Sequence, residues 1–210
     1  MPHILTLLSS ARGLASQSTK VATALTRRLA TELGATVQVR DLTADPLPHI
    51  DVAYTEGRAL PAGQRTSAQL ASTQVAESLI DELTAADVVV IGASMVNFAP
   101  SSSLKAWIDH VVWPGRTMVP TKDGPQGLIA GKKVYLVAAS GGIYSSGPMA
   151  ASDFLVPYLK HTLGCIGLSD VETIRIEAQS FGPEAAQGSL AEAMGQVELL
   201  AAEARQGQPS

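Results

Sequence analysis

The sequence predicts an α/β fold in which helices cover both faces of a parallel β-sheet. Short apolar runs alternate five times with segments whose apolar residues recur at helical spacing, and this alternation is typical of βαβ units. The length of 210 residues is sufficient for one well-filled α/β domain and too short for two ordinary domains with a linker. We therefore expect a single domain over residues 1–205.

The composition argues against several classes of partner. Apolar residues make up 46% of the chain, but no stretch reaches the roughly 18 to 20 uncharged apolar residues of a membrane span. The net charge of −4 is scattered, which argues against a nucleic-acid surface and against an anchor on anionic lipid. The single cysteine permits no intrachain disulfide, and the N-terminus lacks a signal-peptide pattern. We expect a soluble, cytoplasmic protein whose partner is a small molecule.

Five apolar runs are the predicted strands: His3–Leu8, Thr36–Asp41, Asp87–Ala93, Lys133–Ala139 and Val171–Glu177. After the first strand, apolar residues fall four apart from Val21 to Leu33 and form one buried stripe of a helix. Gly34 is placed to end that helix. Later helices are predicted at Ser67–Thr84, Ser101–Val112, Ser152–Gly164 and Pro183–Arg205.

Two long connections interrupt the alternation. Between Leu42 and Ser67, prolines and glycines oppose regular structure, and we interpret the stretch as a surface excursion that serves as a lid or a dimer contact. A second excursion, from Pro114 to Gly131, joins a helix to a strand. Residues 206–210 are predicted to form a frayed, disordered tail.

The stretch "SSARGLASQSTKVATAL" (Ser9–Leu25) places hydroxyl groups between a strand and a helix. The free N–H groups and positive dipole end of a helix attract an anion, and serine hydroxyls add donors without charge. Candidates for binding a phosphate group are Ser10, Ser16, Gln17 and Ser18. The alternative is that Ser16 or Ser18 is simply a helix N-cap. Neither Gly-x-Gly-x-x-Gly nor a P-loop is present, which favours a monophosphate.

Two further loops follow the third and fourth strands. "MVNF" at Met95–Phe98 exposes backbone groups that suit the edge of a flat heterocycle, whereas the alternative is an ordinary turn with Phe98 in the core. Gly141 and Gly142 permit close backbone approach or positive φ, and the alternative is a plain glycine-rich turn. Ligands of open parallel sheets bind at the carboxyl ends of strands, so the three loops together indicate one site.

Other candidate sites lack support. Ser94 does not lie in a nucleophile elbow, because the final glycine of that motif is missing. The four histidines show no metal-ligand spacing, so no metal site is expected. Cys165 lies between apolar residues and is interpreted as a buried small hydrophobe. Trp107 and Trp113 are expected to pack in the core or in an interface.

Taken together, the three loops resemble those of the FMN-dependent NADH-azoreductases, which are flavodoxin-like NAD(P)H:quinone oxidoreductases. The stretches that carry the resemblance are "SS" at 9–10, "SQS" at 16–18, "RDLTADPLPHID" at 40–51, "MVNF" at 95–98 followed by "LKAWID", "SGGI" at 140–143 and "VPYLKHTLGCIGLSDV" at 156–171. They extend over nearly the whole chain. Each motif alone is common, but the combination is specific.

The resemblance implies a flavodoxin-like three-layer sandwich with five parallel strands in the order 2-1-3-4-5, and a homodimer with two FMN sites at its interface. It implies that the FMN phosphate is bound by Ser10, Ser16, Gln17 and Ser18. It assigns the isoalloxazine and ribityl chain to Met95, Val96, Asn97 and Phe98, and the pyrimidine side of the ring to Ala139, Ser140, Gly141 and Gly142. In two places the sequence departs from the family, because Val96 replaces a tyrosine and Ala139–Ser140 replace Ser-Arg.

The implied activity is a two-step hydride transfer from NADH or NADPH, through bound FMN, to an azo compound or a quinone. No catalytic side chain is expected, because the flavin carries the chemistry. The backbone N–H groups of Asn97 and Gly142 are expected to stabilise the charge that develops on the reduced ring. One alternative is a flavodoxin-type electron carrier without direct NAD(P)H oxidation. Such carriers are usually strongly acidic, whereas the net charge of this chain is only −4. Another is a regulatory α/β protein that has lost the site.

Overall fold

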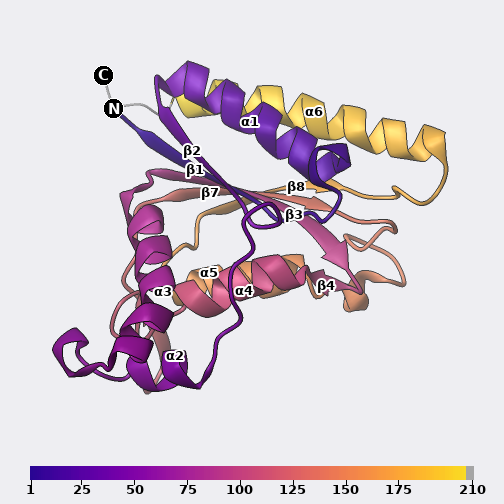
Figure 1. The fold of residues 1–210 in the computed structure, drawn as a ribbon. Helices are drawn as coiled ribbons and strands as arrows, with labels where there is room; N and C mark the ends of the chain where they lie inside the picture. Colours follow the sequence, from indigo (N-terminus) through magenta and orange to yellow (C-terminus); the bar gives the residue numbers. More distant parts are fainter. Residues whose placement is uncertain (207–210) are drawn as a thin grey trace.

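The computed structural model describes residues 1–206 and has the three predicted layers, with a parallel sheet in the middle (Figure 1). The main strands are β1 (His3–Leu8), β2 (Thr36–Asp41), β3 (Val88–Val96), β7 (Lys133–Ala139) and β8 (Val171–Ile176). They pair in parallel in the order β2-β1-β3-β7-β8. Numbered along the chain, this order is the predicted 2-1-3-4-5, so the fold class is confirmed.

Helices cover both faces of the sheet (Figure 1). α1 (Gln17–Leu33) and α6 (Pro183–Gln206) pack together on one face. The other face carries α3 (Ser67–Ala85), α4 (Ser102–Val111) and α5 (Val156–Cys165). The short α2 (Val52–Gly57) packs on α3. Single 3₁₀ turns occur at Gly13–Ala15, Ala62–Gln64 and Ala150–Ser152.

The predicted stripe of α1 faces the sheet. Val21, Leu25 and Leu29 are fully buried in the cluster between α1, α6 and the strands. Gly34 ends the helix in the left-handed conformation, with φ of 61°, as glycine at a helix C-terminus commonly does. The helical spacing of apolar residues therefore sets the face that α1 buries, and Gly34 sets where the helix ends.

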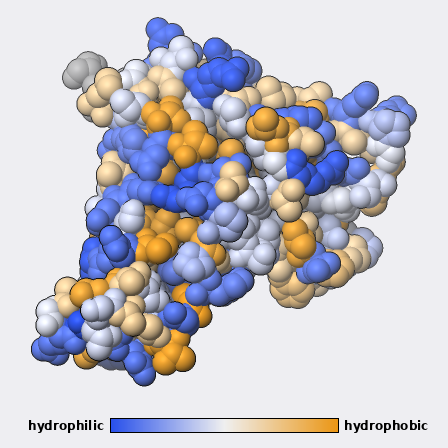
Figure 2. Space-filling model, in the orientation of Figure 1, coloured by the Kyte–Doolittle hydropathy of each residue, from blue (hydrophilic) through white to orange (hydrophobic). Residues whose placement is uncertain are grey.

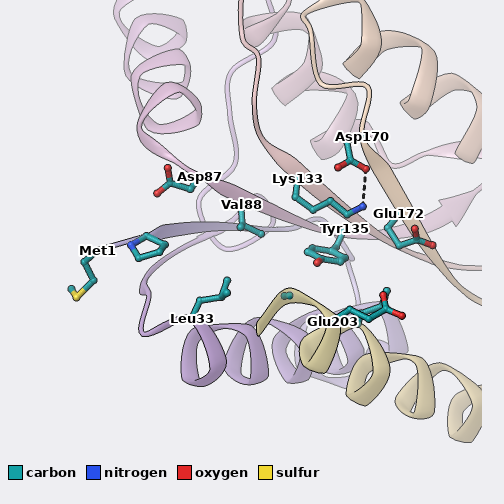
Figure 3. Close-up of a pocket in the computed structure, with 12 residues that line it drawn as sticks. Met1, Leu33, Asp87, Val88, Lys133, Tyr135, Asp170, Glu172 and Glu203 are labelled. Atoms are coloured by element: carbon teal, nitrogen blue, oxygen red, sulfur yellow. Dashed lines mark hydrogen bonds and ion pairs between the residues drawn. The ribbon is translucent and has the colours of Figure 1, made fainter. Parts of the chain in front are cut away.

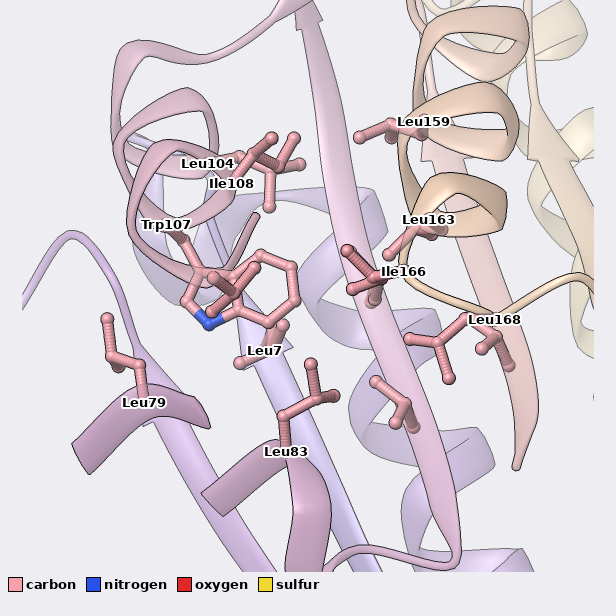
Figure 4. Packing of buried hydrophobic residues seen from close by; sticks show 14 of the residues in the cluster. Leu7, Leu79, Leu83, Leu104, Trp107, Ile108, Leu159, Leu163, Ile166 and Leu168 are labelled. Atoms are coloured by element: carbon pink, nitrogen blue, oxygen red, sulfur yellow. The ribbon is translucent and has the colours of Figure 1, made fainter. Parts of the chain in front are cut away.

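A second, larger apolar cluster fills the space between the sheet and α3, α4 and α5 (Figure 4). Trp107 of α4 lies among leucines of α3 and β1, and Leu159 and Leu163 of α5 close the cluster from the other side. Each large side chain buried in this way contributes about 1.5–3 kcal/mol to the stability of the fold. Of the two predicted placements for Trp107 and Trp113, core or interface, the structure has the core, since their exposed fractions are 1% and 2%.

β3 is longer than predicted and turns back on itself. It continues past Ala93 to Val96 and then pairs in antiparallel fashion with β4 (Ala99–Pro100). The two residues between the paired strands, Asn97 and Phe98, both have positive φ, at 47° and 71°. Two-residue hairpin turns favour positive φ at both central positions, but usually in Asn-Gly or Gly-Gly pairs. The Asn-Phe pair therefore does not predict this turn.

Four other details differ from what the sequence predicts. The excursion between Leu42 and Ser67 contains α2, and the excursion from Pro114 to Gly131 contains a hairpin of β5 (Met118–Thr121) and β6 (Gly124–Gly127). α5 begins at Val156 and not at Ser152, because the Asp153 carboxylate accepts hydrogen bonds from the backbone N–H groups that open the helix there. Gln206 belongs to α6; the rest of the predicted tail, 207–210, lies outside the described residues.

The surface carries apolar side chains in small groups. On the face drawn in Figure 2, orange groups near β2 and α2 are separated by blue polar ones. Val37 and Val39 on the edge strand β2 are 42% and 57% exposed, and Ile50 and Val52 are exposed at the start of α2. In the part of the chain that the structure describes, no helix is long and apolar enough to cross a membrane.

We predict that Gly92→Val lowers the free energy of unfolding by about 1–3 kcal/mol, because a larger side chain pushes α1 off the sheet. Even a single Cβ atom added at Gly92 would lie 3.1 Å from the Cβ of Ala22 and 3.2 Å from the carbonyl oxygen of Ser18. Urea denaturation measures the change. Gly195→Ala is the control, since nothing lies within 4 Å of that Cβ position on α6 and alanine favours a helix. Equal stability of Gly92→Val and the parent protein would contradict this account of the packing.

Candidate functional site

The three predicted loops meet at the carboxyl edge of the sheet. They border a cavity of about 380 Å³. Among the predicted site residues, those that line it are Ser16, Gln17, Met95, Ala139, Ser140 and Gly141. Hydrogen bonds from side chains to the backbone join the first loop to the start of α4 after the second, since the carbonyl oxygen of Ser9 accepts from the hydroxyls of Ser101 and Ser103 at 2.9 and 3.2 Å. One cavity therefore receives side chains from all three loops.

The remaining predicted residues lie around this cavity and do not line it. Ser10 and Ser18 are buried, with exposed fractions of 4% and 0%. Val96, Asn97 and Phe98 lie on the exposed turn between β3 and β4. Phe98 is 45% exposed, so its alternative placement in the core is wrong.

The glycines of the third loop allow close approach of two chain segments. Neither Gly141 nor Gly142 has positive φ, so that part of the expectation is wrong; Gly147 has φ of 73°. A Cβ atom on Gly141 would lie 2.7 Å from the hydroxyl oxygen of Ser180. The N–H group of Ser180 donates to the carbonyl of Gly141 at 2.9 Å. The absence of a side chain at Gly141 therefore lets the loop after β8 reach the site.

The first turn of α1 offers hydrogen-bond donors to the cavity. Ser16 is the N-cap residue, but its side chain makes no capping hydrogen bond, so the interpretation as a simple cap is wrong for this hydroxyl. Its Oγ instead lies 3.0 Å from Ser18 Oγ and 3.3 Å from Ser94 Oγ, and the last two atoms are 2.9 Å apart. We call these three side chains the serine triangle. It lies directly beside a helix N-terminus, where backbone N–H groups lack intrahelical partners.

Two more polar groups at this place are without a partner. Gln17 Oε1 is buried and makes no hydrogen bond with any described residue. The guanidinium group of Arg12 lines the cavity, is exposed, and forms no ion pair within residues 1–206. The Arg12 cation and the dipole of α1 favour one compact anion that accepts several hydrogen bonds, whereas the Gln17 oxygen is an acceptor and calls for a donor.

A network of carboxylates anchors the long loop from Ile143 to Leu155. Glu177 accepts hydrogen bonds from the backbone N–H groups of Tyr144 and Ser145 at 2.8 and 2.9 Å. Asp153 accepts from the N–H groups at the start of α5. Arg175 of β8 pairs with both carboxylates, at 3.3 Å to Glu177 and 2.8 Å to Asp153. One cation thus fixes both ends of the loop.

The same loop contacts the exposed turn after β3. The N–H group of Phe154 donates to the carbonyl oxygen of Phe98 at 3.0 Å. The rings of Phe98 and Tyr144 meet edge to face, with centroids 6.1 Å apart. The second and third loops are therefore ordered as one unit.

Sequence reasoning missed several residues that line the cavity. Gln179 and Ser180 follow β8, and their N–H groups donate to the carbonyls of Ser140 and Gly141. The available signal was their position after the fifth strand, since that strand also ends at the carboxyl edge. Ser94 was considered only as a nucleophile, although it precedes the "MVNF" stretch directly.

A larger cavity, of about 810 Å³, lies at the opposite edge of the sheet (Figure 3). Tyr135 and Val88 line it from the first residues of their strands, and Lys133 pairs with Asp170 at 2.7 Å. Burial raises the pKa of the Tyr135 phenol, and the nearby Lys133 ammonium opposes this rise. Because open α/β sheets bind ligands at the carboxyl ends of their strands, the smaller cavity is the candidate site.

No metal centre is found in the described part of the chain, where no group of three or more His, Cys, Asp or Glu side chains could hold an ion. His110 is buried, and its Nε2 lies 2.9 Å from the carbonyl of Pro48. Cys165 is only partly buried, with Sγ 3.8 Å from His161 Nε2, so its interpretation as a buried hydrophobe is wrong. It lies on α5, at the helix end remote from the cavity.

The family model described as "Flavodoxin-like fold" matches residues 2–200. The chain belongs to this flavodoxin-like family. The flavodoxin-like chain is 50% identical over 201 residues to the FMN-dependent NADH:quinone oxidoreductase 2 of Rhizobium etli, covering 95% of this chain and 98% of the relative. It is 46% identical to the FMN-dependent NADH:quinone oxidoreductase 1 of Burkholderia lata, with 97% and 100% covered. These findings confirm the resemblance inferred from the three loops.

Solved structures agree with this family. A crystal structure of an azoreductase from Bacillus anthracis str. Sterne is 28% identical, has a TM-score of 0.88, and covers 96% of this chain and 99% of that chain. An azoreductase described as AzrA gives the same values. The structural likeness to these azoreductases therefore extends over almost the whole chain.

We predict that Arg175→Met loosens the loop of this flavodoxin-like chain from Ile143 to Leu155. The Asp153 side chain is 3% exposed, and removal of its partner leaves a buried carboxylate without a counter-charge. Amide hydrogen exchange at Tyr144 and Ser145 should become faster.

The control for this experiment is Arg28→Met. Arg28 pairs with Glu198 where both side chains are about half exposed, and such a pair contributes little to stability. Its loss should leave exchange in the loop unchanged. Unchanged exchange in Arg175→Met as well would show that the loop is held without the arginine.

Proposed function

We propose that this protein is an FMN-dependent oxidoreductase that transfers hydride from NADH or NADPH to quinones or azo compounds. The observation that carries the proposal is one cavity at the carboxyl edge that all three loops line, with Ser16 and Gln17 from the start of α1, Met95 from the end of β3, and Ala139 to Gly141 from the loop after β7. Relatives at 45–50% identity are named FMN-dependent NADH:quinone oxidoreductases, which supports the same cofactor and donor.

The groups at the start of α1 suit the phosphate of FMN. Hydroxyls of Ser16 and Ser18 and the backbone N–H groups of the first turn all donate, and a phosphate dianion accepts from several donors at once. Gln17 also lines the cavity, and its side-chain NH₂ group is a donor, whereas its buried and unpartnered Oε1 is an acceptor. Ser10, which is buried beside Arg12, completes the proposed phosphate set. These donors therefore fit a monophosphate.

The other two loops suit the flavin ring. We assign the ring and ribityl chain to Met95, Val96, Asn97 and Phe98, and the pyrimidine side to Ala139, Ser140, Gly141 and Gly142. Within residues 1–206, the backbone N–H groups of Asn97 and Gly142 donate no hydrogen bond, so both are available to a ligand. Ser140 is less free, because its hydroxyl donates to the Gly142 carbonyl at 2.9 Å.

The mechanism follows from these positions. Bound FMN supplies the hydride chemistry, and the protein supplies binding, orientation and electrostatics. Backbone donors at Asn97 and Gly142 stabilise negative charge on the ring without a titratable side chain. Val96 and Phe98, about half exposed, offer apolar surface on which a flat donor or acceptor can stack.

The decisive experiment is the visible spectrum of the purified protein, followed by stopped-flow mixing with NADH. We expect flavin absorption bands that bleach on a timescale of catalytic turnover and recover when a quinone or an azo dye is added. A bound flavin that NADH does not reduce would indicate an electron carrier of the flavodoxin type. Absence of flavin, with no flavin-dependent NADH oxidation after FMN is added, would contradict the proposal.

We further propose that the active form is a homodimer joined at the carboxyl edge, and that it works as a single domain, residues 1–205, in the cytoplasm. The proposed interface is supported by large apolar side chains that are exposed on the loops around the cavity: Val96, Phe98, Ile143, Met149, Phe154 and Phe181. A group of this kind on a soluble protein marks an interaction site. The single cysteine is in keeping with a reducing compartment.

We predict that Phe154→Glu converts the dimer to a monomer, because a charge placed in an apolar interface must be desolvated without a partner. Phe154 is 59% exposed in the single chain. Sedimentation velocity at micromolar concentration measures the state. Leu199→Glu, on α6 and 65% exposed, is the matched control and should remain dimeric. A parent protein that sediments as a monomer at high concentration would exclude this assembly.

A further inference from the structure

Ser94 has no role in the proposed function so far, yet it lies at the centre of the phosphate-binding groups. It is two residues past Gly92 on β3, so it points to the same face of the sheet, toward α1. Its hydroxyl lies 2.9 Å from Ser18 Oγ and 3.3 Å from Ser16 Oγ, and it lines the cavity.

The number of protons in the serine triangle limits what it can donate. Each hydroxyl carries one proton and accepts through two lone pairs. Three hydroxyls in mutual contact can use all three protons among themselves, and then no proton points outward. For Ser16 and Ser18 both to donate to an anion, the one proton left inside the triangle must come from Ser94.

A water molecule does not readily replace the Ser94 hydroxyl as the donor inside the triangle. Ser16 and Ser18 are 3% and 0% exposed, and their oxygens lie 3.0 Å apart. Without an inner donor, either one of them turns its proton inward, or two acceptor oxygens face each other in a buried place. Both outcomes weaken the binding of an anion, because a buried polar group without a partner carries its full desolvation penalty.

From this geometry we propose that Ser94 is a positioning residue for the phosphate of FMN. Its single proton stays inside the triangle and is donated to Ser18 Oγ, the nearer of the two neighbours, which leaves the protons of Ser18 and Ser16 free to point toward the phosphate oxygens. The inference rests on the proposed function. It assigns to Ser94 a hydrogen-bonding role in place of the nucleophilic one that the sequence pattern argues against.

The test compares FMN with riboflavin, which lacks the phosphate and is otherwise the same ligand. Dissociation constants of both are measured by quenching of flavin fluorescence in the apoprotein. We expect Ser94→Ala to weaken FMN binding about tenfold, as for the loss of one hydrogen bond that serves a charged group. Riboflavin binding should stay within about twofold, because the ring contacts are untouched. A merely structural role of Ser94 would change both ligands alike.

Two variants whose side chains have the same shape as each other separate the loss of the hydroxyl from effects on folding. Ser94→Thr keeps the hydroxyl and should retain the preference for FMN over riboflavin, whereas Ser94→Val replaces that hydroxyl with a methyl group and should lose it. Ser103→Ala is a control from the same edge of the sheet. Its hydroxyl contacts Ser101 and the Ser9 carbonyl instead of the triangle, so the preference should not change.

The outcomes separate this inference from the proposed function. If the parent protein binds neither flavin, the proposed function fails, and the role of Ser94 fails with it. If the parent binds FMN but Ser94→Ala loses both flavins equally, or loses neither, the proposed function stands and the positioning role is overturned. Equal behaviour of Ser94→Thr and Ser94→Val would also overturn it.

Discussion

The close packing of α1 on β3 is the constraint on which the carboxyl edge depends. Gly92 has no side chain, and α1 lies so close that a Cβ there would be 3.1 Å from the Cβ of Ala22 and 3.2 Å from the Ser18 carbonyl oxygen. Because side chains on a strand repeat every second residue, Ser94 faces the same helix one step further along. The short distance between helix and strand at Gly92 therefore brings the hydroxyls of Ser18 and Ser94 within 2.9 Å.

The same arrangement explains why the site needs few charges. The donors that face the cavity are hydroxyls, backbone N–H groups and one exposed arginine, Arg12, and no acidic cluster lies among the lining residues. A helix N-terminus and neutral donors attract an anion at modest electrostatic strength. Such a site is compatible with a chain whose net charge is only −4. Selectivity for one phosphate follows from the geometry of the donors more than from charge.

Strand positions were predictable where burial on both faces makes a continuous apolar run. β1 and β7, which are buried in this way, begin and end at the predicted residues. The edge strand β2 also has its predicted bounds, although its valines are exposed, because they alternate with polar residues in the period of a strand. β3 runs three residues further than predicted, because "SMV" keeps its pairing with β7 at Ser94 and with β4 at Met95 and Val96. That pairing depends on a turn with positive φ at Asn97 and Phe98, and residue preferences do not indicate such a turn at phenylalanine. The helix α2 was missed because only six residues form it.

The candidate site was predictable in its loops and not in its details. Hydroxyl-rich and glycine-rich stretches after three strands indicated the cavity, since parallel strands end at one edge. Gln179 and Ser180 carry no such signal; they reach the cavity through backbone hydrogen bonds to Ser140 and Gly141, which only the folded chain brings near. The network around Arg175 was equally hidden, because its partners Asp153 and Glu177 lie on different loops. Contacts between distant segments are therefore what the sequence alone did not supply.

The turn at Asn97 and Phe98 has a consequence for the thermodynamics of ligand binding. Its backbone is fixed by pairing of β3 with β4 and by the hydrogen bond from Phe154 to Phe98. Fixing one residue of a flexible loop costs about 1–2 kcal/mol of conformational entropy. Here that entropy is lost when the chain folds, before any ligand arrives. The affinity of the site can therefore be carried by a few hydrogen bonds, because little of their free energy is consumed in ordering the loop that makes them.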